Sequence, residues 1–120
     1  MLVKTIFSGD DDILLLPQNL INEISRVRSS DSIEAIGCKK GPEGVERNPK
    51  NKYFIPNQMY RDEKWHAYFS GAGYLTTGNF SKELAKMAEK TKVVPLDDCW
   101  IGILINKMNK RFENLKIIIL

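Results

Sequence analysis

The residues best suited to chemistry in this sequence are two sets of aspartates. Three adjacent carboxylates occupy positions 10–12, and two more occupy positions 97–98. If the backbone is extended through the first set, Asp10 and Asp12 face one way and Asp11 faces the other. Two carboxylates on one side of a strand end suit a hard cation such as Mn²⁺ or Mg²⁺, which also relieves their repulsion and can hold a diphosphate.

Each set of aspartates also has a purely structural interpretation. Residues 10–12 can form an acidic turn in which one carboxylate caps the following helix, and a DxD pattern is short enough to occur by chance. Asp97 and Asp98 begin an expected helix, where one can cap and the helix dipole tolerates the other. The functional alternative makes one of this pair a general base that accepts a proton from a sugar hydroxyl. Leu14 excludes both an EF-hand loop and a phosphatase-type DxDxT signature.

A glycine-rich stretch with aromatic neighbours lies between the two acidic sets. The sequence SGAGYLTTG at 70–78 does not match GxGxxG, so a Rossmann phosphate loop is not indicated. Gly71 and Gly73 are expected to let the backbone pass close to a ligand or to another strand. Trp65 and Tyr68 can stack on a sugar face or can equally belong to the core.

Composition and length predict one globular domain over residues 1–120. The chain is 42% hydrophobic and 28% charged, with a net charge of +3 spread along it, so nucleic-acid binding is not indicated. We expect no membrane span or signal peptide, because no apolar run approaches about 18 residues. The single His66 has no partner at zinc-ligand spacing. Cys38 and Cys99 are expected to be buried thiols, although pairing across a long loop is open.

Hydrophobic periodicity and turn residues predict a mixed α/β or α+β fold. Pro17 marks the first turn of one expected helix, and Asn79 is the expected cap of another, which buries Phe80, Leu84, Met87 and Ala88. The expected elements are a strand at 2–7, a helix at 17–28, a strand at 32–38, a loop at 39–52, a short strand at 52–55, a β-prone stretch at 66–78, helices at 79–90 and 97–108, and a strand at 115–120.

Four segments taken in order resemble the β-1,3-galactosyltransferase family of nucleotide-sugar transferases. They are GDDDILLLPQNL, KYFIPNQMY, AYFSGAGYLTT and VVPLDDCWIGILINKM, and they span Phe7 to about Asn109. One such segment would be a weak signal, whereas four with similar gaps are specific. The resemblance implies a partial GT-A-like fold that corresponds to the C-terminal half of a catalytic domain.

The resemblance also implies a chemistry and a role for each site residue. It implies an inverting transfer of galactose or N-acetylglucosamine from a UDP-sugar to an acceptor hydroxyl, with Mn²⁺ or Mg²⁺ as cofactor. Asp12 would bind the metal with Asp10, Asp98 would be the catalytic base, and Asp11 would support the metal, ribose or donor sugar. The remaining positions assigned to substrate binding are Trp65, Tyr68, Gly71, Gly73, Tyr74 and Asp97.

The family context sets expectations for partners and place of action. Relatives of this type are typically type II membrane proteins of the Golgi that act on glycan, glycoprotein or glycolipid acceptors. We therefore expect a Golgi protein without nucleic-acid partners, with membrane attachment only through a family-type anchor, which we do not expect within residues 1–120. A second interpretation is a non-catalytic family member that keeps part of the fold without turnover.

Overall fold

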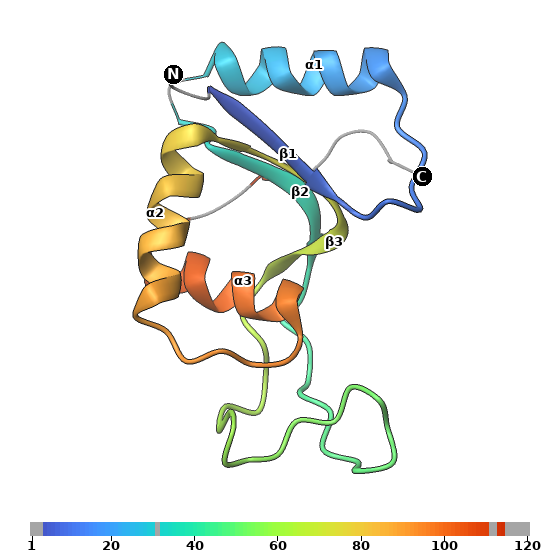
Figure 1. The fold of residues 1–120 in the computed structure, drawn as a ribbon, viewed down its shortest axis with the longest axis vertical. Coiled ribbons are helices and arrows are strands. Elements are labelled where there is room, and N and C mark those ends of the chain that lie inside the picture. The colour runs from blue at the N-terminus through green and yellow to red at the C-terminus, as the bar shows by residue number, and fades with distance from the viewer. Residues whose placement is uncertain (1–3, 31, 111–112, 115–120) are drawn as a thin grey trace.

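The structure is a computed structural model that describes residues 4–30, 32–110 and 113–114. It confirms the mixed α/β class (Figure 1). The strands are arranged in the order β1-β3-β2-β4, antiparallel except for the β2–β4 pair, which is parallel. In chain order the elements are β1 (Thr5–Gly9), α1 (Pro17–Arg28), β2 (Ala35–Lys40), β3 (Tyr68–Thr77), α2 (Gly78–Glu89), α3 (Asp97–Lys107) and β4 (Glu113–Asn114).

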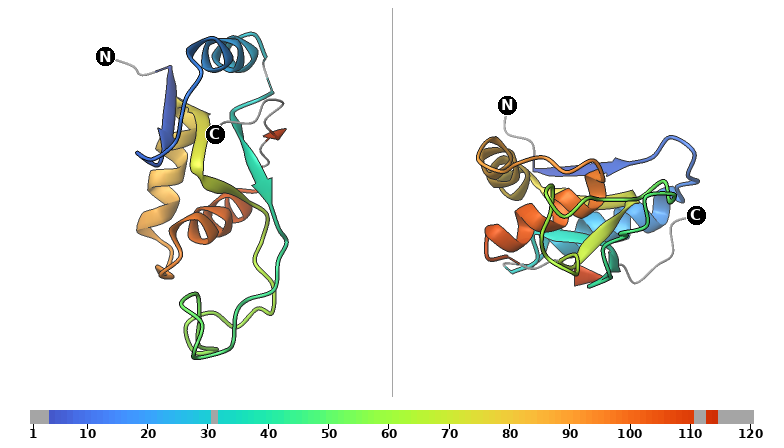
Figure 2. Two further views of the ribbon diagram at one scale, coloured as in Figure 1. Left: turned by 90° about the vertical axis from the view of Figure 1, so that its right-hand side faces the viewer. Right: turned by 90° about the horizontal axis from the view of Figure 1, so that it is seen from below.

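Helices cover both faces of the sheet. Side chains alternate between faces along a strand, so the two central strands β2 and β3 supply residues to apolar clusters on both faces. On one face, α1 packs on the strands through Val27, Ile36 and Leu75. On the other face, α2 and α3 share a cluster with Ala35, Phe69, Phe80 and Ile105. The helix α1 consequently lies apart from α2 and α3, at the end of the molecule opposite the long loop 41–67 (Figure 1, Figure 2).

The start of α2 differs from the sequence expectation in its cap. Thr77 is the last extended residue before the helix, and its Oγ1 accepts a hydrogen bond from the backbone N–H of Phe80 at 3.1 Å. Asn79 is therefore not the cap, because it already lies inside the first helical turn. The predicted buried face is confirmed: Phe80 is fully buried, and Leu84, Met87 and Ala88 are half-buried.

The expected short strand at 52–55 is wrong. These residues form a turn and irregular backbone inside loop 41–67. The N–H of Phe54 donates to the carbonyl of Asn51 at 3.1 Å, and that of Ile55 donates to the carbonyl of Glu46 at 3.0 Å. Ile55 is fully buried in a cluster with residues of α3, so its apolar character reflects packing within the loop and not sheet pairing.

The prediction that both cysteines are buried holds for only one of them. Both are free thiols, with Cys99 buried and Cys38 exposed. The register of β2 against β3 shifts between Gly37 and Lys39, so Cys38 sits at an irregularity where the buried part of β2 ends. The strand expected at 115–120 lies outside the described residues.

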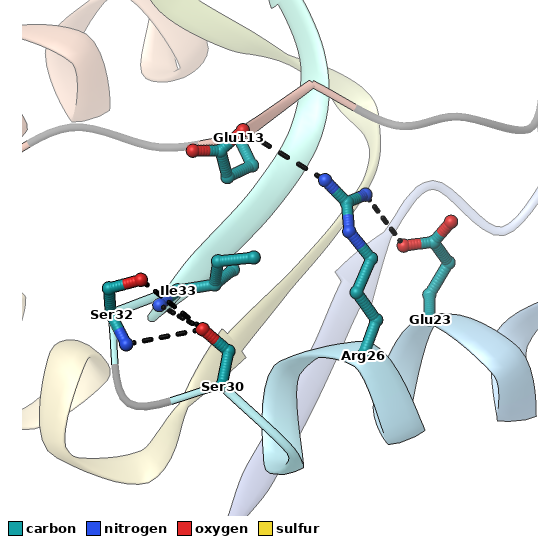
Figure 3. A network of polar contacts seen from close by, with 6 residues as sticks. All are labelled: Glu23, Arg26, Ser30, Ser32, Ile33 and Glu113. Atoms are coloured by element: carbon teal, nitrogen blue, oxygen red, sulfur yellow. Dashed lines mark hydrogen bonds and ion pairs between the residues drawn. The ribbon is translucent and has the colours of Figure 1, made fainter.

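The connection from α1 to the far edge of the sheet is polar (Figure 3). Arg26 contacts two carboxylates, Glu23 at 3.3 Å and Glu113 of β4 at 3.9 Å. Just after the helix, the Oγ of Ser30 accepts hydrogen bonds from the N–H groups of Ser32 and Ile33 at 3.2 and 3.1 Å. These contacts turn the chain from α1 towards β2.

The packing of α3 on β3 is close because Gly102 lies between them. A Cβ added at Gly102 would lie 2.6 Å from the Cβ of Tyr68 and 2.8 Å from the carbonyl oxygen of Ala67. Contacts this short are not tolerated, and one of the two partners is backbone that cannot rotate away. Only glycine permits α3 to approach β3 this closely.

We expect Gly102→Ala to lower the free energy of unfolding by about 1–3 kcal/mol, since the extra methyl group must push α3 away from β3. Urea denaturation measures the change. Gly44→Ala is the matched control, because nothing lies within 4 Å of an added Cβ there. Equal stability of the two variants would show that α3 is not held at this distance.

Candidate active site

The acidic set at 10–12 follows directly after β1. The strand ends at Gly9, and the N–H of Asp10 still donates to the carbonyl of Ala72 on β3 at 3.2 Å. Asp11 and Asp12 then form a turn, and all three carboxylates are exposed. The extended backbone that would have aligned Asp10 with Asp12 is therefore not present, because the chain reverses after Asp10.

The second acidic set occupies the first turn of α3. The N-cap residue Leu96 provides no side-chain cap, so the two aspartates take up the first-turn N–H groups instead. Asp97 Oδ1 accepts from the N–H of Asp98 at 2.8 Å, and Asp98 Oδ1 accepts from the N–H of Cys99 at 2.9 Å. The helix dipole favours negative charge at this position. The structural role suggested by the sequence is thus present for both residues, and it fixes the direction of both carboxylates.

One cleft brings the two acidic sets together. It has a volume of about 210 Å³ and lies between the end of β1, the first half of β3 and the start of α3. Gly71 forms part of its wall, and a Cβ added there would lie 3.9 Å from the Cβ of Asp98. Five of the ten residues singled out from the sequence line this cleft: Asp10, Gly71, Tyr74, Asp97 and Asp98.

The other five residues lie elsewhere. Asp11 and Asp12 are in the exposed turn beside the cleft. Gly73 is buried against β1, where an added Cβ would lie 3.0 Å from the Cζ of Phe7. Trp65 and Tyr68 are 4% and 6% exposed and belong to the core cluster between α3 and loop 41–67. Their rings are therefore mostly covered by protein.

A second cavity adjoins the first through Asp98. It has a volume of about 370 Å³ and lies between α3 and loop 41–67, with Trp65 and Tyr68 in its wall. Sequence reasoning missed the loop residues that line it, among them Glu43, Glu46 and Tyr53. The one usable signal was Tyr53, an aromatic residue within a strongly polar stretch.

Burial raises the pKa values of two groups next to Asp98, both of which are already protonated at neutral pH in water. Desolvation raises the pKa of the Cys99 thiol to about 12, and the negative charge of Asp98 adds to the shift. Desolvation likewise raises the pKa of Tyr68 well above its usual range, with a further contribution from its hydrogen bond to Glu43. Both groups therefore stay protonated at neutral pH, and neither competes with Asp98 as a base.

The described part of the chain contains neither a three-residue metal cluster nor a helix that could span a membrane. Within residues 4–30, 32–110 and 113–114, no three His, Cys, Asp or Glu side chains are grouped so that they could hold a metal ion by themselves. In the same residues, no helix has the length and apolar character needed to cross a membrane.

The chain belongs to the galactosyltransferase family. The family model described as galactosyltransferase matches residues 2–116, which is nearly the whole chain. This match confirms the resemblance carried by the four sequence segments. It also covers both acidic sets and the glycine-rich strand that lies between them in the sequence.

Curated relatives include β-1,3-N-acetylglucosaminyltransferases and a β-1,3-galactosyltransferase. The rat UDP-GlcNAc:betaGal beta-1,3-N-acetylglucosaminyltransferase 7 is 30% identical over 101 residues, covering 84% of this chain and 25% of the relative. The human N-acetyllactosaminide beta-1,3-N-acetylglucosaminyltransferase 2 is 28% identical, with 86% and 26% covered. The chimpanzee Beta-1,3-galactosyltransferase 5 is 26% identical, with 58% and 23% covered. The chain spans about a quarter of the length of these relatives.

Proposed function

We propose that this chain contributes the catalytic side of a hexosyltransferase that moves a sugar from a UDP-sugar to an acceptor hydroxyl with inversion. The observation that carries the proposal is the cleft shared by Asp10 and Asp98, which come from distant parts of the sequence. Inversion requires a base on the face of the sugar opposite the leaving group, and it requires stabilisation of the departing diphosphate. Two separate acidic positions in one cleft match those two tasks.

The acidic turn is the proposed place of a divalent cation, Mn²⁺ or Mg²⁺. The carboxylates of Asp10 and Asp12 are hard oxygen donors, and such a cation is commonly held by one or two carboxylates together with substrate phosphates and water. Three protein ligands are therefore not needed, and their absence among the described residues fits a site completed by the substrate. When bound, the cation would offset the charge of the diphosphate as UDP departs. Asp11 would support the cation, the ribose or the donor sugar.

Asp98 is the proposed base. Its Oδ1 is held by the N–H of Cys99, so the carboxylate is oriented before the substrate arrives. Gly71 leaves space beside it, and Tyr74 and Asp97 complete this end of the cleft, where the donor sugar would lie. The acceptor hydroxyl would lose its proton to Asp98 as its oxygen attacks the anomeric carbon.

The donor sugar and the cellular location are proposed from the relatives of this chain. The relatives are named for transfer of N-acetylglucosamine or galactose. We therefore propose that one of these two sugars is delivered as the UDP-sugar to a glycan, glycoprotein or glycolipid acceptor. On the basis of the family, we propose that this activity belongs to protein or lipid glycosylation and that it takes place in the Golgi.

We expect UDP to bind the chain more tightly with Mn²⁺ than without it, because the carboxylates of the acidic turn would hold the cation and the cation would offset the charge of the diphosphate. Isothermal titration calorimetry of the native chain, Asp10→Asn and Asp12→Asn measures this difference. Each substitution should abolish most of the metal-dependent gain. Asp62→Asn, an exposed aspartate of loop 41–67, is the control. UDP binding that changes neither with Mn²⁺ nor with the substitutions would contradict the metal assignment.

We expect Asp98→Asn to lower the rate of sugar transfer by about 10²–10⁴-fold, the usual contribution of a general base. The amide oxygen of asparagine can still accept from the N–H of Cys99, so the fold should be retained. Asp97→Asn should cost much less. Transfer from UDP-galactose and UDP-N-acetylglucosamine is measured on this chain and on any longer form of the protein that contains it. A native rate for Asp98→Asn would refute the base assignment, and UDP binding without any turnover would favour the non-catalytic interpretation.

A further inference from the structure

The second cavity adjoins the proposed reaction centre at Asp98. Asp98 lines both the 210 Å³ cleft and the 370 Å³ cavity, whereas Asp10 and Gly71 line only the cleft. A volume of about 370 Å³ falls within the range of roughly 300–1,000 Å³ that is typical of small-molecule sites. A ligand in this cavity would therefore present its atoms to the same carboxylate as a ligand in the cleft.

The loop that forms the outer wall of the cavity is fixed by hydrogen bonds. Arg47 donates to three backbone carbonyls within the loop, at 2.8, 2.9 and 2.9 Å. The N–H of Trp65 donates to the carbonyl of Glu43 at 2.8 Å, and that of Val45 donates to the carbonyl of Glu63 at 2.9 Å. The cavity is consequently present before any ligand binds, and little ordering of the chain is needed on binding.

The lining of the cavity combines hydrogen-bond acceptors with aromatic rings. The hydroxyl of Tyr68 donates to Oε2 of Glu43 at 2.8 Å and so holds that carboxylate at the wall. Tyr53 is 51% exposed, although it lies in a cavity wall. Sugar hydroxyls can donate to the carboxylates, and the apolar face of a sugar ring can pack on an exposed tyrosine. These groups suit a carbohydrate.

The side chains that line the cavity carry an excess of negative charge. Three carboxylates, Glu43, Glu46 and Asp98, line the cavity, together with the ammonium group of Lys40. A second ammonium group, that of Lys52, lies 4.8 Å from the ring centroid of Tyr53 in the cavity wall, so the carboxylates are still in excess. An anionic group placed among them would meet like charges, which is a common way of rejecting a wrong ligand. A neutral sugar would not meet this repulsion.

We propose that this cavity holds the acceptor as a neutral glycan, and that Glu43 and Glu46 exclude acceptors that carry a sulfate or another anionic group. This inference rests on the proposed function, because it takes Asp98 as the base that the acceptor hydroxyl must reach. It adds to the proposed function the place where the acceptor binds, and it adds that loop 41–67 selects neutral acceptors over anionic ones.

The test compares two probes that differ by one sulfate group: a neutral galactose-terminated disaccharide and its sulfated form. Their dissociation constants are measured by saturation-transfer NMR in the presence of UDP and Mg²⁺, for the native chain and for the double variant Glu43→Gln, Glu46→Gln. Glutamine keeps the size of each side chain and an acceptor for Tyr68. The native chain should prefer the neutral disaccharide, and the double variant should reduce that preference by about tenfold or more, which corresponds to roughly 1.4 kcal/mol.

The control is Glu63→Gln, which removes a carboxylate from the same loop at a residue outside the cavity lining. It should leave the preference unchanged. Raised salt should weaken the preference of the native chain, because the two glutamates are partly accessible to solvent. A preference that is the same in the native chain and the double variant, or failure of the neutral disaccharide to bind, would overturn the proposal.

The outcomes separate this inference from the proposed donor site. If UDP binds with the cation and the neutral disaccharide does not bind, the acceptor assignment is wrong and the donor assignment stands. If the disaccharide binds with the expected charge preference and UDP does not bind, the donor assignment is wrong and the cavity is a glycan site in its own right.

Discussion

The close packing of α3 on β3 at Gly102 is the constraint on which the rest of the site depends. Because no side chain separates the two elements there, the start of α3 lies beside the glycine-rich half of β3, and Asp98 comes next to Gly71. The same packing places Cys99 and Ile103 against Trp65 and thereby anchors loop 41–67. One contact between a helix and a strand thus positions the proposed base, forms one wall of the cleft and supports the adjoining cavity.

The acidic residues serve both structure and the proposed chemistry. Asp97 and Asp98 satisfy N–H groups of the first turn of α3, a role that any helix with this start needs. That role does not compete with catalysis, since a carboxylate oriented by a backbone N–H is also prepared to receive a proton. The buried neighbours Tyr68 and Cys99 remain protonated, and Asp98 is the carboxylate that lines both cavities.

Local sequence patterns predicted most of the helices and strands, but they predicted only about half of the residues that line the cleft. Pro17, the apolar spacing of α1 and the buried face of α2 are local signals, and each of them held. The prediction of a strand at 52–55 was wrong because Ile55 is buried within a folded loop. The fold of that loop depends on hydrogen bonds between residues that are far apart in the sequence. Trp65 and Tyr68 could be interpreted as core residues or as ligand platforms, and the structure places them both in a core cluster and in the wall of the second cavity. The acidic loop residues Glu43 and Glu46 carried no local signal, because their position depends on the same loop fold.

The central claim is that UDP and a divalent cation occupy the cleft between β1, β3 and α3. Paramagnetic broadening tests it most directly, because Mn²⁺ weakens the NMR signals of nuclei close to it. On addition of UDP and a small amount of Mn²⁺, the amide signals of residues 10–12, 71 and 98 should broaden, while those of α1 and of residues 57–63 should not. Broadening centred elsewhere, or equal broadening with Mn²⁺ alone and throughout the chain, would contradict the account.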